Sequence, residues 1–137
     1  MLPSTRIVSA GDRERLIPVI DRARNSWLTY APYLDLFDRE LRRSRAVPPS
    51  EVPPDLVTMN SRFALETPTD GGPVCYMLVY PEEESPTMRK VSVLSPMGTA
   101  LLGSRVGDEV CWVAPDGPVA ATVLRLLYQP EAAGDAR

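Results

Sequence analysis

Side chains able to carry out chemistry are few in this sequence. It holds no histidine, and its two cysteines, Cys75 and Cys111, are isolated from each other, so no set of metal ligands is available. It also lacks a nucleotide-binding loop and a nucleophile paired with a general base. One carboxylate pair, Asp35 and Asp38, has the i, i+3 spacing that places both on one face of a helix. We therefore expect no enzymatic activity, no metal and no cofactor.

Both cysteines lie in stretches that are typical of strands. We interpret Cys75 and Cys111 as two buried thiols in a reducing cytosol, with a disulfide as the alternative. The N-terminal residues lack the apolar core of a signal peptide, and no apolar run approaches the length of a membrane span. These features predict a soluble, cytoplasmic protein that does not enter a membrane.

Charge is unevenly distributed along the chain, whose net charge is −3. Residues 1–46 hold nine arginines against six acidic residues, and residues 47–137 hold six basic against twelve acidic residues. General DNA-binding proteins show a concentrated basic face instead. The pattern argues against direct sequence-specific DNA binding and favours a protein or assembly as partner. Nothing in it indicates an obligate dimer, so we expect a monomer.

Two predicted helices must position the carboxylate pair. The first begins near Ala10 and carries apolar residues every three or four positions, at Leu16, Ile20, Ala23 and Trp27. Pro18 lies inside this helix and is expected to kink it or to separate its first turn. The second begins near Pro32, with a matching stripe at Tyr30, Leu34, Phe37 and Leu41. Since neither stripe can be buried alone, residues 1–46 predict an antiparallel helical hairpin, a short coiled coil.

The tip of this predicted hairpin is apolar and contains no acidic residue. It consists of Trp27, Leu28, Thr29 and Tyr30, with Asp35 set back on the second helix. The large apolar side chains either close the hairpin or contact a partner, and the sequence leaves both open. Asp35 and Asp38 are most simply read as a solvated flank of the helix.

A proline-rich segment separates the hairpin from the rest of the chain. Four prolines in residues 47–55 favour a stiff, extended linker. Residues 56–131 then predict an α+β domain of about five strands and one short helix, and residues 132–137 a flexible tail. The expected strands are 56–65, irregular near Asn60, then 74–80, 90–94, 109–113 and 119–128.

The short helix follows an abrupt Ser-Pro stop. Ser95 is a plausible N-cap, and Pro96 has the fixed φ that suits a first helical turn. Met97 and the apolar residues after it form one or two turns, and Gly103 ends them. So short a helix must pack on the flanking strands to be stable.

Several motifs in the second domain resemble those of one protein family. They are TMNSR (58–62), LVYPEE (78–83), VSVLSPMGTALLG (91–103), VGDEV (106–110) and YQPEAAGD (128–135). They are similar to the Rnk branch of the GreA/GreB family of transcript elongation factors, whose members are named as regulators of nucleoside diphosphate kinase. The resemblance is strong over residues 56–135 and extends to the hairpin only in architecture.

The resemblance implies an FKBP-like second domain and an N-terminal coiled coil that approaches the secondary channel of bacterial RNA polymerase. In Gre factors the corner around the Ser-Pro motif docks on the channel rim, which corresponds here to Ser95, Pro96 and Met97. These residues are also explained by starting a helix, and the two roles are compatible. An FKBP-like fold suggests prolyl isomerase activity as a further possibility. We do not expect it, because the active-site pocket of such an enzyme is lined by several aromatic residues, and those of this domain are scattered.

Gre factors stimulate transcript cleavage with carboxylates at the coiled-coil tip, which help to hold a metal ion. The tip of this chain has none, and its hairpin is shorter. The resemblance therefore implies a non-catalytic transcription regulator that binds RNA polymerase and competes with Gre-type factors without stimulating cleavage. The alternative is a protein-binding regulator of nucleoside diphosphate kinase.

Overall fold

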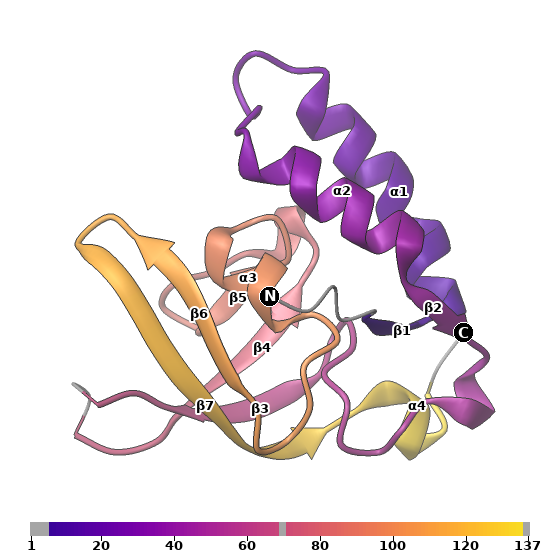
Figure 1. Ribbon diagram of the computed structural model, residues 1–137. Helices are drawn as coiled ribbons and strands as arrows, with labels where there is room; N and C mark the ends of the chain where they lie inside the picture. The colour runs from indigo at the N-terminus through magenta and orange to yellow at the C-terminus, as the bar shows by residue number, and fades with distance from the viewer. Residues whose placement is uncertain (1–5, 69–70, 136–137) are drawn as a thin grey trace. The chain divides into compact units, whose positions relative to one another are not determined.

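The computed structural model describes residues 6–68 and 71–135 (Figure 1). The chain divides into two compact units, with the boundary between Val52 and Pro53. Below, the first is called the helical unit and the second the sheet unit. Within the described ranges, no helix has the length and apolar character needed to cross a membrane.

The helical unit consists of two helices framed by two short strands. Its elements are β1 (Ile7–Ser9), α1 (Ala10–Arg24), α2 (Tyr33–Arg43) and β2 (Arg45–Val47), followed by the 3-10 turn η1 (Pro49–Glu51). The helices run in opposite directions, because Arg13 near the start of α1 donates to the Ser44 carbonyl after α2 at 3.0 Å, and Arg24 at the end of α1 bonds Asp35 in the first turn of α2.

Local chemistry explains where α1 begins. The Ser9 hydroxyl accepts a hydrogen bond from the Asp12 amide at 3.3 Å and caps the first turn. Leu16 and Ile20 on α1 are fully buried, as is Leu41 on α2, so the predicted apolar stripes form the core of this unit except at Trp27 and Tyr30, which are exposed. The α1 helix continues without interruption through Pro18, and its first turn is not a separate piece.

The strands that frame the helices were not predicted. β1 pairs in parallel with β2, with Ile7 opposite Arg45 and Ser9 opposite Val47. We expected only an extended lead before α1, and residues 45–47 looked like the transition from a helix to a linker. Three residues are too few to show an alternating pattern, and the pairing depends on a contact across the whole helical pair.

The sheet unit is a curled five-stranded sheet with short helices (Figure 1). Its elements are β3 (Arg62–Glu66), β4 (Val74–Val79), the 3-10 turn η2 (Pro81–Glu83), β5 (Lys90–Ser92), α3 (Pro96–Leu101), β6 (Glu109–Ala114), β7 (Gly117–Tyr128) and α4 (Pro130–Ala133). The strand order is β5-β4-β3-β7-β6, with β4 and β5 parallel and the other neighbours antiparallel. The α+β class is therefore observed.

One face of this sheet forms the core of the unit. Phe63 and Leu65 on β3 are buried, with Leu78 on β4 and Val123 on β7. Phe63 stacks on Tyr76 with ring centroids 6.4 Å apart. The predicted irregularity near residue 60 is also present, since Asn60 has a left-handed φ of 66° just before β3 begins at Arg62.

The prediction of buried cysteines is wrong. Cys75 and Cys111 are both free and exposed. Cys75 lies opposite Ala64 in the β3–β4 register, and Cys111 opposite Ala120 in the β6–β7 register. Strand side chains alternate between faces, and these two point away from the core. Neighbouring apolar residues made the two strands look buried on both faces.

The segment after β7 is held against the sheet unit, although we expected a flexible tail from residue 132. Gln129 is buried, and its amide nitrogen donates to the carbonyls of Leu56 at 2.7 Å and Pro53 at 2.8 Å. Asp135 accepts a hydrogen bond from the Tyr128 hydroxyl. Residues 136–137 of the predicted tail lie outside the described residues. Small, polar residues do not reveal such bonds in the sequence.

Candidate functional site

The predicted docking corner, Ser95-Pro96-Met97, is held rigidly at the start of α3. The Ser95 hydroxyl accepts a hydrogen bond from the Gly98 amide at 3.0 Å and donates one to the Ser92 carbonyl at 2.7 Å. Pro96 occupies the first helical position, as predicted. Pro96 is exposed, whereas Ser95 and Met97 are partly exposed, so the corner presents a small surface of fixed shape.

Gly98 explains why the corner is so close to the sheet, and the sequence analysis missed it. A Cβ atom at Gly98 would lie 2.0 Å from the Ser92 carbonyl oxygen and 2.8 Å from the Val93 Cα. Both are backbone atoms and cannot rotate away, so only glycine permits this packing. Leu101, one turn further along α3, is fully buried and also anchors the helix. The presence of a glycine inside a short apolar helix was the sequence signal that could have indicated this close packing.

The helical unit places the predicted tip residues in the loop between α1 and α2, residues 25–32. Trp27 is 88% exposed and Leu28 73% exposed. They do not close the pair of helices, which was one of the two readings left open. Thr29 donates from its hydroxyl to the Ala23 carbonyl at 3.0 Å and ties the loop to the end of α1. The apolar side chains therefore project from a backbone that is itself held.

Two further apolar side chains extend this exposed surface onto α2. Tyr33 and Leu36 are exposed on the first turns of that helix, and Tyr30 is exposed in the loop before it. Sequence analysis did not select Tyr33 or Leu36, because each lies beside the buried stripe rather than within the predicted tip. The exposed apolar surface is thus larger than predicted.

Asp35 does not stand free in solvent. Its carboxylate accepts hydrogen bonds from the Arg24 Nε at 2.8 Å and from the Tyr30 hydroxyl at 2.7 Å. The Tyr30 hydrogen bond and the Arg24 contacts lower the pKa of Asp35 below its ordinary value. The same hydrogen bond raises the pKa of Tyr30, because losing the phenolic proton would place two negative charges together.

Asp38 is buried, so the reading of this residue as part of a solvated flank is wrong, whereas Asp35 is partly exposed. It accepts a hydrogen bond from the Arg42 Nε at 3.0 Å and a longer one from Arg24 at 3.4 Å. Arg42 also pairs with Asp21 on α1 at 3.3 Å. The carboxylates thus form an ion-pair network between the helices, which we call the arginine–aspartate network (Asp21, Arg24, Asp35, Asp38, Arg42).

This network commits the carboxylate oxygens to arginine and tyrosine donors. A divalent cation needs several oxygen ligands that can turn toward it. In residues 6–68 and 71–135, no group of three or more potential ligands is placed to hold a metal ion. Chemically, the arrangement stabilises the helical pair by charge-assisted hydrogen bonds.

Comparison with known proteins gives a consistent result. Residues 52–128 match the family described as "Transcription elongation factor, GreA/GreB, C-term". Over 132 residues, the chain is 40% identical to the "Regulator of nucleoside diphosphate kinase" of Escherichia coli strain K12, and the alignment covers 96% of this chain and 95% of that protein. It is also 32% identical over 97 residues to GreA of Clostridium botulinum, covering 71% of this chain and 61% of that protein.

A solved structure extends the similarity to the fold. The prokaryotic transcription elongation factor GreA/GreB from Nitrosomonas europaea superposes with a TM-score of 0.76 at 32% sequence identity. The superposition covers 91% of this chain and 99% of that one.

Proposed function

The chain belongs to the GreA/GreB family of transcription elongation factors, and from that premise we propose that it is a non-catalytic regulator that binds bacterial RNA polymerase at the entrance of the secondary channel. It docks there through Ser95, Pro96 and Met97, competes with Gre-type factors for the same place, and does not stimulate transcript cleavage. Such a factor acts in the cytoplasm, as a monomer, through contacts with protein rather than with a DNA sequence.

The construction of the corner supports docking. Pro96 is exposed, and its position is fixed by the two Ser95 hydrogen bonds and by the close approach of Gly98 to Ser92. A rigid binding surface loses little conformational entropy when a partner binds. The Ser-Pro motif is also where Gre relatives are expected to meet polymerase, so a shared corner implies mutually exclusive binding.

The single observation that carries the absence of cleavage activity is the state of the carboxylates. The tip loop contains no acidic residue. Asp35 and Asp38, the nearest candidates, are bonded to Arg24, Arg42 and Tyr30. Releasing them toward a metal ion would leave these donors without their partners, Asp38 being the more buried of the two.

The length of the helices supports the same conclusion. α1 has 15 residues, which corresponds to ~22 Å at the rise of an α-helix. The resemblance to Gre factors implies a longer coiled coil that carries acidic residues to the active centre. In this proposal, a helical pair as short as the one here places Trp27 and Leu28 nearer the channel entrance, where apolar side chains contact the channel wall.

Binding to purified RNA polymerase core enzyme tests the docking corner. We expect the variant Pro96→Glu with Met97→Glu to lose most of its binding, because two charges would enter an apolar contact. Val113→Glu is the matched control, since Val113 is an exposed apolar residue on β6 and is not one of the three corner residues. Unchanged binding of the double variant would overturn the docking assignment, and failure of the wild-type protein to bind would overturn the proposal.

A second candidate function rests on the E. coli relative, which is named a regulator of nucleoside diphosphate kinase. Here the chain would bind that kinase directly as a protein-binding module. This alternative predicts a complex with purified kinase in the absence of polymerase, whereas the first proposal predicts none.

A further inference from the structure

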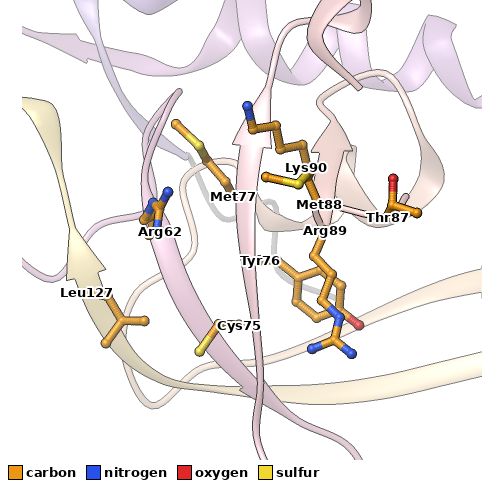
Figure 2. A pocket seen from close by; sticks show the side chains of 9 residues that line it. All are labelled: Arg62, Cys75, Tyr76, Met77, Thr87, Met88, Arg89, Lys90 and Leu127. Atoms are coloured by element: carbon orange, nitrogen blue, oxygen red, sulfur yellow. The ribbon is translucent and has the colours of Figure 1, made fainter. Parts of the chain in front are cut away.

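A second surface of the sheet unit lies outside the docking corner. A groove of about 430 Å³ opens where β3, β4 and β7 meet the turn before β5 (Figure 2). Three cationic residues line it, Arg62, Arg89 and Lys90, together with apolar side chains that include Met77, Met88 and Leu127. None of these residues belongs to the proposed docking corner.

The sheet register explains why these side chains gather. Arg62 on β3 is opposite Met77 on β4, and Met77 is opposite Lys90 on β5. Residues directly opposite on neighbouring strands point to the same face. The three therefore form a row across the sheet, on the face that also exposes Cys75 and lies opposite the buried core.

Arg89 is placed by a strained turn. The Ser85 amide donates to the Lys90 carbonyl at 3.0 Å, and the Lys90 amide donates back to Ser85 at 2.9 Å. Closing this turn gives Arg89 a φ of 54°, in the left-handed region that residues other than glycine and asparagine rarely adopt. The turn thus fixes one cation at the edge of the groove.

Among residues 6–68 and 71–135, the cations of the groove have no carboxylate partner. Residues 53–135 hold five basic and eleven acidic residues. Arg105 pairs with Asp55 in that range, but within the described chain Arg62, Arg89 and Lys90 form no ion pair. Three cations are therefore available to an external anion, although acidic residues are more than twice as numerous in the unit.

Exposed apolar side chains line the same groove as these charges. Met88 is 68% exposed and Leu127 49% exposed. Methionine is flexible and polarisable, and it adapts to apolar groups of different shapes. The groove therefore offers apolar contact as well as positive charge, which a site for a simple anion would not need.

We propose that this groove binds an acidic protein segment in which apolar side chains alternate with carboxylates. Met88 and Leu127 contact the apolar side chains, and Arg62, Arg89 and Lys90 pair with the carboxylates. The proposal does not depend on the proposed docking at polymerase, because it uses a different surface and names only the chemistry of the partner.

An extended acidic segment fits better than a phosphate group or a nucleic acid. Figure 2 shows the charged ends of Arg62, Lys90 and Arg89 pointing in separate directions instead of converging on one point. The sheet unit has an excess of acidic residues, and Glu82 and Glu83 on η2 lie close to β5. These negative charges would repel a nucleic acid, which carries one negative charge per nucleotide. Tyr76 borders the groove, but it is opposite Phe63 in the β3–β4 register and its ring stacks on Phe63 on the core face, so it does not offer a platform for bases.

The exposed cysteines provide a direct test in the full chain. Cys75 lines the groove and Cys111 does not, and both are exposed. A short peptide alternating glutamate and leucine should slow alkylation of Cys75 in the Cys111→Ser protein severalfold at saturation. Alkylation of Cys111 in the Cys75→Ser protein should be unchanged. No protection of Cys75, or equal protection of both thiols, would overturn the proposal.

Matched charge variants identify the cations. Arg89→Asn with Lys90→Gln removes two positive charges, and asparagine tolerates the left-handed φ at position 89. We expect this variant to weaken peptide binding at least tenfold, and Arg62→Gln to weaken it less. The control, Arg22→Gln with Arg43→Gln, removes two exposed charges from the helical unit and should leave the affinity unchanged. If both double variants lost the same peptide affinity, binding would depend only on the net charge of the protein, which would contradict the proposal.

Two further probes separate the possible ligands. A glutamate peptide without leucine should bind at least tenfold more weakly than the alternating peptide, because Met88 and Leu127 lose their contacts. A single-stranded oligonucleotide of similar charge should bind more weakly still. If the oligonucleotide bound more tightly than the peptide, and the Arg89→Asn, Lys90→Gln variant lost affinity for it to the same extent, the ligand would be a nucleic acid. That result would overturn the assignment.

Discussion

The two units treat charge in opposite ways. In the helical unit, Asp35 and Asp38 are bonded to arginines of both helices, and the exposed side chains at the tip are apolar. In the sheet unit, Arg62, Arg89 and Lys90 of the groove form no ion pair with any residue that the structure describes. The number of charges in a segment therefore does not identify a binding surface. A binding surface is indicated instead by charged side chains that have no partner within the protein.

The same contrast applies to rigidity. The docking corner is fixed by glycine packing against a strand, whereas the tip is fixed only through its backbone, with Trp27 and Leu28 projecting into solvent. Substitutions in the corner should therefore act on stability and on binding together, and substitutions at the tip on binding alone. Four predictions test this comparison, in decreasing order of expected effect on stability.

Gly98→Ala should have the largest effect. Its Cβ would lie 2.0 Å from the Ser92 carbonyl oxygen, and overpacking against backbone costs about 1–3 kcal/mol or more. Urea unfolding should show this loss, and polymerase binding should weaken with it. Gly71→Ala is the control, because nothing lies within 4 Å of its Cβ position. A stable Gly98→Ala protein would mean that the corner is not fixed by this contact.

Asp38→Asn should have the next largest effect. Asp38 is buried and receives hydrogen bonds from Arg42 and Arg24, so neutralising it should cost about 1–2 kcal/mol of unfolding free energy. Asp55→Asn, which breaks the exposed pair with Arg105 in the sheet unit, should cost less than about 1 kcal/mol. Equal losses in urea unfolding would contradict the contrast between the buried and the exposed pair.

A pH dependence should follow from Asp35. Because its pKa is lowered in the folded chain by the Tyr30 hydrogen bond and by Arg24, its contribution to stability is fully present above the unfolded pKa. That contribution is lost as the pH falls through the folded pKa. In Tyr30→Phe, a carboxyl NMR titration should show the pKa of Asp35 closer to its ordinary value. Urea unfolding should show that the two proteins differ less at acidic pH. An unchanged titration would mean that the hydrogen bond does not form in solution.

Trp27→Ala should have the smallest effect on stability. With Trp27 88% exposed, thermal unfolding should change by less than about 0.5 kcal/mol. Polymerase binding should nevertheless weaken severalfold, because an apolar contact with the channel wall is lost. A large loss of stability would restore the reading in which this side chain closes the helical pair.

Local signals in the sequence predicted the local structure. The start of the first helix near Ala10 and the Ser95-Pro96 start of α3 depend on near neighbours in the chain, and both were predicted correctly. The apolar stripes were predicted correctly except at Trp27 and Tyr30, which are exposed. The family resemblance was also correct, since its motifs are contiguous.

Features that depend on distant contacts were missed. The β1–β2 pairing, the outward orientation of Cys75 and the burial of Asp38 arise from tertiary neighbours that no short pattern contains. The groove is the clearest case, because Arg62 and Lys90 come together only through the register of three strands. The requirement for Gly98 likewise depends on the distance to another element.

Competition on RNA polymerase tests the central claim most directly. A labelled Gre-type factor bound to core polymerase should be displaced by the wild-type protein and not by the Pro96→Glu, Met97→Glu variant. Arrested elongation complexes should at the same time show no transcript cleavage beyond background. Simultaneous binding of both proteins, or stimulated cleavage by this chain alone, would contradict the account.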